Sequence, residues 1–280
     1  MSFIKELGNT PTKQYDSDFG KESGNCVSVN KEESLRKKIW RVCKCVFYEL
    51  KSALFLLAVY PLPMLKGRRQ WSKPPEGQNH GHILLLHGLF HNSSAWTKDF
   101  VNSLVDKGFH VHVLDLKNTT NSQDGIKGLA LQVDKYIKDN NLEGRISLIG
   151  HSEGGLVAAK YVEEIAPEGS INKVITIGSP WKGSSWANAF SFLGSCVREM
   201  RTDSEPLGKL WEKVNRKENK TSYHFMGCRG DMLVPFSRSY PGEDPLGENP
   251  REEVVELDVE GGHAHLLLSP KTKEQIHKIL

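Results

Sequence analysis

A serine bracketed by glycines is at the centre of the most informative motif in the sequence. Residues 149–155 read Ile-Gly-His-Ser-Glu-Gly-Gly, so Gly150 and Gly154 stand two positions either side of Ser152. A turn this tight needs neighbours without side chains, and it exposes the serine hydroxyl at a helix N-terminus, where the backbone dipole favours developing negative charge. Because a predicted buried strand precedes the motif and a predicted helix follows it, the pattern indicates a nucleophile.

A serine hydroxyl is a weak nucleophile, so it needs a base, and the base needs an acid to orient it. Asp231 follows the predicted strand 222–227, after a glycine that lets the backbone turn. His263 follows a pair of glycines after the last predicted strand, and His265 is the alternative base. The chain order Ser152, Asp231, His263 is the one expected when the serine lies on a sharp turn between a strand and a helix. A purely structural role for Asp231, in an Asx turn, remains the competing interpretation.

An acyl-transfer serine also needs backbone N–H groups aimed at the oxyanion. The N–H of Glu153, directly after the serine, is one candidate donor. The other candidate lies in the His-Gly turn after the predicted strand 82–86, where Leu89 is favoured over Phe90. We interpret His87 in the same turn as a hydrogen-bonding loop residue.

From about residue 82 onward the chain resembles the α/β-hydrolase superfamily, and within it the bacterial lipases and esterases. The matching segments are LLLHGLF, LIGHSEGG, ITIGSPWKGSSWA, GDMLVP and GGHAHLLLSP. The resemblance implies Ser152 as nucleophile, Asp231 as acid and His263 as base, Leu89 and Glu153 as oxyanion donors, and no cofactor or metal. It leaves open a thioesterase, amidase or acyltransferase, and a non-catalytic binding module that keeps the fold.

The elements that must position these residues alternate along the chain. Short apolar runs predict strands at 82–86, 110–116, 145–149, 173–177, 222–227 and 254–259. Helical patterns separate the first four strands, at 96–107, 126–140 and 153–165. Such alternation indicates an α/β fold with a mostly parallel sheet covered by helices on both faces. The interval 181–221 is too long for an ordinary connection and holds two amphipathic stretches, so we predict an inserted helical cap.

The N-terminal part of the chain has a different composition. We predict a disordered polar tail at 1–33, a basic and apolar helix with a linker at 34–79, and the hydrolase domain at 80–280. Residues 31–73 contain eleven Lys and Arg but only three Glu, and the basic residues lie on both sides of the apolar run 52–65. Because a spanning helix needs about twenty residues, we expect 40–69 to lie on a membrane surface. A helix packed on the domain and a spanning signal-anchor are the alternatives.

Composition narrows the functional class. A net charge of +3 does not indicate nucleic-acid binding. Five cysteines without regular spacing predict neither a disulfide framework nor a metal site, and they favour a reducing compartment. We therefore expect a cytoplasmic serine hydrolase, able to lie peripherally on a membrane, that cleaves a small-molecule or lipid-like acyl ester through an acyl-serine intermediate. The aromatic side chains of the predicted cap suit an acyl chain. The sequence does not set the oligomeric state.

Overall fold

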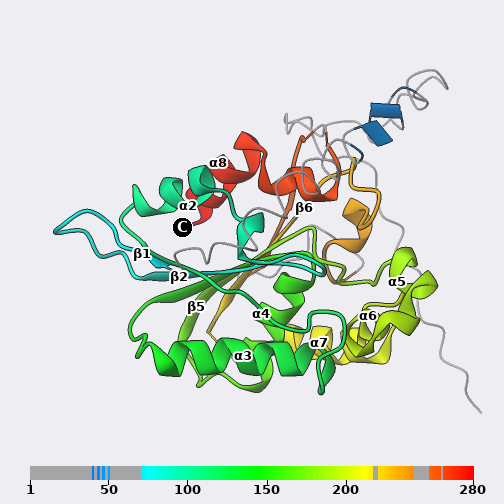
Figure 1. Ribbon diagram of the computed structural model, residues 1–280, viewed down its shortest axis with the longest axis horizontal. Helices are drawn as coiled ribbons and strands as arrows, with labels where there is room; N and C mark the ends of the chain where they lie inside the picture. Colours follow the sequence, from blue (N-terminus) through cyan, green and yellow to red (C-terminus); the bar gives the residue numbers. More distant parts are fainter. Residues whose placement is uncertain are drawn as a thin grey trace, which may run out of the picture. The chain divides into compact units, whose positions relative to one another are not determined.

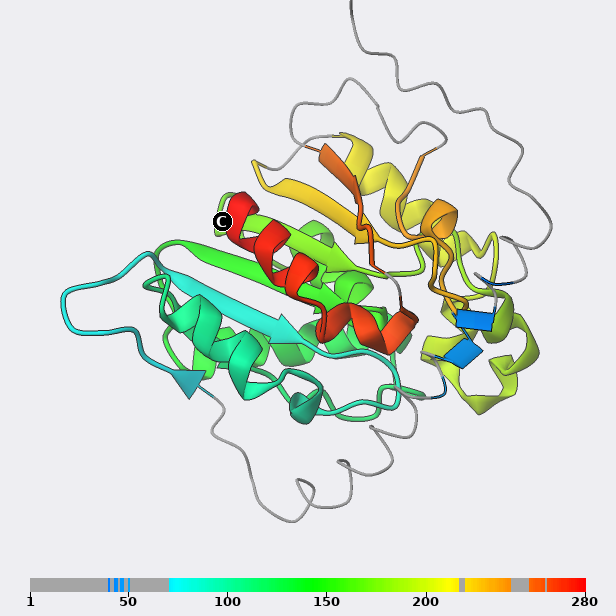
Figure 2. The same ribbon diagram turned by 90° about the horizontal axis from the view of Figure 1, so that it is seen from above.

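A seven-stranded sheet forms the centre of the molecule (Figures 1 and 2). The computed structural model describes residues 71–216, 220–242, 252–259 and 261–280, together with positions 40, 43, 44, 46, 47 and 50. The expected tail at 1–33 lies outside the described residues, and so does most of the segment 34–79. Among the described residues, no helix has both the length and the apolar character needed to cross a membrane.

The strand order is β1-β3-β2-β4-β5-β6-β7, and every neighbouring pair is parallel except β1 with β3. The strands are β1 (Trp71–Ser72), β2 (His82–Leu86), β3 (His110–Val113), β4 (Ile146–His151), β5 (Ile171–Ile177), β6 (Ser222–Gly227) and β7 (Glu252–Glu256). All six residues of β4 are buried, as expected for a central parallel strand covered on both faces. The predicted fold class is confirmed.

Helices cover both faces of this sheet (Figure 2). They are α2 (Lys98–Val105), α3 (Gly125–Asp139), α4 (Glu153–Glu164), α5 (Ser185–Ala189), α6 (Ser195–Glu199), α7 (Glu205–Arg216) and α8 (Pro270–Ile279). Because side chains alternate along a strand, β2 supplies two cores. Leu84 and Leu86 pack in the core with α3, α4 and α7, whereas Ile83 and Leu85 pack in the core with α2 and α8.

The interval 181–221 is helical, as predicted, but its first amphipathic stretch is not one helix. It is divided into α5, a short 3-10 helix (Ser191–Leu193) and α6, and Gly194 separates the last two where the chain passes so close to the backbone carbonyl of Thr120 that a Cβ atom would collide with it. The second stretch forms α7, whose apolar side chains join the core beneath α4. The cap that reaches the edge of the sheet therefore consists of α5 and α6.

Other element boundaries also differ from the prediction. The strand expected at 110–116 ends at Val113, and the N–H of Leu116 donates to the Nε2 atom of His87 (2.9 Å) instead of extending the ladder. Strand β7 begins two residues before the predicted 254–259 and ends at Glu256. The short antiparallel strand β1 and helix α8 were not predicted.

Candidate active site

Ser152 occupies a backbone conformation that few non-glycine residues adopt. It lies between β4 and α4 with φ 55° and ψ −126°, and its N–H donates to the carbonyl of Ile177 (2.8 Å). A Cβ atom at Gly150 would collide with the backbone of Gly154, and one at Gly154 would collide with the carbonyl of Leu86. The turn therefore requires both glycines. Backbone strain of this kind persists only where the surrounding structure holds the residue in place, and strained residues cluster at functional sites.

The turn after β2 lies against this serine. A Cβ atom at Gly88 would stand 2.7 Å from the Cβ atom of Ser152. Glu153 is the first residue of α4, and the N–H of a first helical residue has no acceptor within its own helix. The two predicted oxyanion donors, Leu89 and Glu153, thus come from segments that flank Ser152 on both sides.

A buried hydrogen bond joins the side chains of Asp231 and His263. The Nδ1 atom of His263 lies 2.6 Å from Oδ2 of Asp231, and both residues are buried. Because a carboxylate only accepts, Nδ1 carries the proton and Nε2 keeps its lone pair. The other oxygen, Oδ1, accepts the N–H groups of Leu233 (3.0 Å) and Val234 (2.7 Å). The turn-stabilising interpretation of Asp231 therefore holds alongside the one that pairs it with histidine.

The position of His263 differs in detail from the expectation. It begins a 3-10 helix, His263–Leu267, instead of lying on an open loop. The hydrogen bond that His263 donates to Asp231 favours His263 over His265 as the base.

Ser152 and His263 line the same cavity, whose volume is about 190 Å³. The turn after β2 contributes one wall, with Leu89 and Phe90. The cap contributes an apolar wall that includes Trp186. The remaining lining residues are Gly88, His91, His151, Pro180, Ser184, Ala187, Met200, Leu233 and Val234. Five segments of the chain, at 88–91, 151–152, 180–200, 233–234 and 263, therefore meet at the carboxyl end of the sheet.

Two further histidines in this cavity were not singled out from the sequence. The ring of His151 lies 4.7 Å from that of His263 and is stacked on that of His91 at 5.8 Å. The Nε2–H of His151 donates to the backbone carbonyl of His263 (3.1 Å). Burial lowers the pKa of His151 well below its usual value and that of His91 to about 4. Both rings are therefore neutral near pH 7 and place no positive charge beside His263.

His87 has the structural role expected of it. Its Nε2 atom accepts the N–H of Leu116, so Nδ1 carries the proton and donates to the carbonyl of Gly88 (3.0 Å). Burial lowers the pKa of His87, which keeps this ring neutral. The bonded ring holds the turn that presents Leu89.

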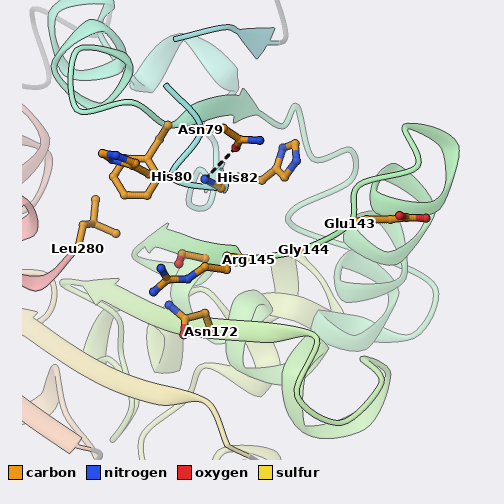
Figure 3. A pocket seen from close by; sticks show the side chains of 11 residues that line it. Asn79, His80, His82, Glu143, Gly144, Arg145, Asn172 and Leu280 are labelled. Carbon is orange, nitrogen blue, oxygen red and sulfur yellow. Dashed lines mark hydrogen bonds between the residues drawn. The ribbon is translucent and has the colours of Figure 1, made fainter. Parts of the chain in front are cut away.

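A second, larger cavity of about 430 Å³ lies at the opposite end of the sheet (Figure 3). His82, Arg145 and Asn172 line it at the starts of β2, β4 and β5. Its lining includes a serine, Ser147, but the Nδ1 atom of His82 is bonded to another histidine, His112 (3.0 Å). Glu143 also lines this cavity, but His82 is hydrogen-bonded to a second histidine, whereas His263 at the carboxyl end is hydrogen-bonded to a carboxylate.

The described residues contain no group of three or more His, Cys, Asp or Glu side chains that could hold a metal ion. Among the described residues, Cys43, Cys196 and Cys228 form no disulfide.

The comparisons with known proteins agree with this architecture. Residues 81–200 match the family model described as alpha/beta hydrolase fold. The lipase BlEst2 of Bacillus licheniformis, in its mature form, is similar in structure with a TM-score of 0.55 and 17% identity, over 75% of this chain and 96% of that one. A lipase-esterase related protein from Clostridium acetobutylicum gives a TM-score of 0.53 and 16% identity, over 75% and 98%. A bromoperoxidase from Bacillus anthracis gives 0.54 and 16%, over 74% and 93%. A search of curated proteins finds no match to the sequence.

Proposed function

Since this chain has the fold of the α/β-hydrolase superfamily, as its motifs indicated, we propose that it is a serine hydrolase that cleaves carboxylic esters. The observation that carries the proposal is the juxtaposition of two structures in one cavity. One is the strained turn that presents Ser152, and the other is the buried bond between Asp231 and His263. A binding module that merely kept the fold would have no need for either. The similarity to lipases and esterases supports the same reaction class.

In the proposed mechanism each group has a step. The Nε2 atom of His263 accepts the proton of Ser152 as the serine oxygen attacks the ester carbonyl carbon. The resulting imidazolium is stabilised by Asp231, and the N–H groups of Leu89 and Glu153 bind the oxyanion. Collapse of the intermediate breaks the ester bond, and His263 returns its proton to the departing alcohol. Water then repeats the sequence on the acyl-serine and releases the carboxylic acid.

An apolar rim around the cavity supports a lipid-like acyl group as the substrate. Phe90 contacts Trp186 edge to face at 5.9 Å, Trp186 lies 4.7 Å from Phe190, and Phe190 lies 6.1 Å from Phe192. The series runs from the cavity lining to Phe192, which is 76% exposed. A cavity of about 190 Å³ is smaller than the roughly 300–1,000 Å³ typical of small-molecule sites. A long acyl chain would therefore extend along this rim.

Peripheral membrane contact through residues 40–69 is part of the same proposal. Most of this segment lies outside the described residues. Trp40, Phe47 and Leu50 are exposed, and the ammonium of Lys44 lies 5.8 Å from the centre of the Trp40 ring. Exposed aromatic and basic side chains are typical of surfaces that bind anionic lipid. Co-sedimentation with anionic liposomes, compared between the full chain and a chain that starts at Pro74, tests this contact. Equal partitioning of the two would contradict it.

Active-site labelling with a fluorophosphonate tests the enzyme proposal directly. The wild type should be labelled and Ser152→Ala should not be, because the probe phosphonylates an activated serine. Absence of labelling in the wild type, or equal labelling of the variant, would leave the binding-module alternative. A panel of p-nitrophenyl esters from acetate to palmitate, with matched thioesters and anilides, then separates an esterase from a thioesterase or an amidase. An acyltransferase would give a transesterified product when an alcohol is added.

A further inference from the structure

The side chain of Glu153 is buried directly beside the proposed nucleophile without a strong partner. It is fully buried, and neither carboxyl oxygen makes a hydrogen bond of regular geometry within the described residues. The polar group that approaches it is the thiol of Cys196, a weak donor. Leaving a carboxylate buried with so little compensation is costly, and such groups take up a proton instead. Burial accordingly raises the pKa of Glu153 well above its usual value.

Among the residues that the structure describes, the ionisable groups that act on this carboxyl group are Cys196 and Glu199, and neither is a cation. Helix α6 of the cap presents Cys196, which is fully buried, and Glu199, which is partly buried. The Glu199 carboxyl accepts the N–H of Ile126 at 3.4 Å, and Lys160 of α4 acts on Glu199. The Glu199 charge opposes ionisation of Glu153 and adds to the effect of burial.

The position of Glu153 couples two parts of the site. Its backbone N–H is one proposed oxyanion donor, and its side chain packs against Cys196 of α6. Met200, directly after α6, lines the cavity. Any change in charge at this carboxyl group would therefore act on the serine turn and on the cap together.

We propose that Glu153 is a positioning residue that works as a neutral carboxylic acid, holding the start of α4 against cap helix α6, and that its ionisation switches the site off. The inference rests on the proposed function. A neutral acid leaves the positive end of the α4 dipole available to the oxyanion. A carboxylate at the same place would oppose the negative charge that develops on the substrate oxygen, and it would repel Glu199 across the cap contact.

Glu153→Gln tests this idea, because the amide has the size of the neutral acid and cannot lose a proton in the alkaline range. The measurement is kcat/KM against pH from 6 to 10, with the rate of Ser152→Ala subtracted and each curve normalised to its own maximum. The wild-type curve should fall on the alkaline side, and the Glu153→Gln curve should lack this fall. Glu199→Gln is the matched control, since it removes the neighbouring carboxyl group, and its curve should keep the fall but at a lower pH, because the charge that opposes ionisation of Glu153 is gone. Superimposable curves for the wild type and Glu153→Gln would overturn the proposal.

A second measurement does not depend on catalysis. When folding raises the pKa of a carboxyl group, the free energy of unfolding decreases as the pH rises from the unfolded pKa towards the folded pKa. In the Ser152→Ala background, adding Glu153→Gln should therefore raise Tm by an amount that grows between pH 5 and 8 and reaches at least about 2 °C. A Tm difference that is constant with pH would also overturn the proposal. Failure of fluorophosphonate labelling alone would instead refute the proposed function and leave this buried neutral acid in place.

Discussion

Histidines gather at both ends of the same sheet, and their hydrogen-bond partners differ between the end that we propose to be catalytic and the other end. At the carboxyl end, His263 is bonded to the carboxylate of Asp231 and shares a cavity with Ser152. At the amino end, His82 is bonded to His112, whose Nδ1 atom lies 3.1 Å from the hydroxyl of a tyrosine. The comparison shows that the hydrogen-bond partners of a histidine decide which chemistry it can perform. The loops that follow parallel strands at their carboxyl ends can bring such partners together.

The largest expected difference between the two ends is in turnover. Ser152→Ala and His263→Ala should each lower kcat by on the order of 10⁴-fold or more, and the double variant should lose no more than either, because these residues act as a unit. His82→Ala at the amino end should change kcat by less than about twofold, as a surface substitution away from the site does. Steady-state kinetics on a p-nitrophenyl ester measures all four. An inactive His265→Ala with an active His263→Ala would contradict the assignment of the base.

Asp231→Ala should be severe but less so. The histidine keeps its place through its backbone, while its orientation and the stabilisation of its charge are lost. By analogy with other triads, about 10- to 100-fold more activity should remain than in Ser152→Ala. The same assay checks this, with circular dichroism to show that the variant still folds. Residual activity as low as that of Ser152→Ala would contradict this order of effects.

A pair of glycines sharpens the comparison further. Gly178 has φ 58°, and a Cβ atom there would lie 3.2 Å from Oδ2 of Asp231 and 3.3 Å from Cε1 of His263. Gly144, at the amino end, has φ 84° and open space around its Cβ position. Alanine at either site strains the backbone by about 1–2 kcal/mol. Only Gly178→Ala should also lower kcat, by about 10- to 100-fold, because it displaces the Asp231–His263 pair. Equal kcat values for the two variants would show that this contact is accommodated without cost.

The smallest effect concerns stability at the amino end. Burial, followed by the charges of His82 and His110, lowers the pKa of His112 to about 4. Because the folded pKa lies below the unfolded value, the unfolded chain binds more protons between pH 4 and 6.5, and stability falls as the pH falls through this window. At pH 5 this corresponds to about 2 kcal/mol. Urea unfolding at pH 5 and 7 should therefore show a smaller pH dependence for His112→Gln than for the wild type. An unchanged pH dependence would mean that His112 is not the group responsible.

The sequence predicted those features that depend on local pattern. The central strands are continuous apolar runs, and the serine turn carries its glycines in a fixed order, so both could be located without a structure. Helix α8 was missed because only Thr272, Ile276 and Ile279 of its ten residues are buried. Its one clear signal is Ser269 before Pro270, a serine at the N-cap followed by a proline at the first helical position. Strand β1 has two residues and no pattern to detect.

Within the site, what could not be predicted is what depends on distant neighbours. His91 and His151 become neutral, stacked rings only because the cavity closes around them. Glu153 appears in the sequence as an ordinary charged residue at the start of a helix, and its burial depends on α6, more than forty positions later. The division of the cap at Gly194 likewise follows from the nearby backbone of Thr120, which no periodicity reports.

The bond from the ring of His151 to the carbonyl of His263 has a consequence for how activity arises as the chain folds. It joins residues 112 positions apart, and the turn at Ser152 needs the carbonyl of Ile177 as well. Parallel sheets built from such distant contacts fold slowly, because the loops must close before the contacts form. During synthesis Ser152 emerges before His263, so under the proposed mechanism a partly made chain would lack the base that activates its serine.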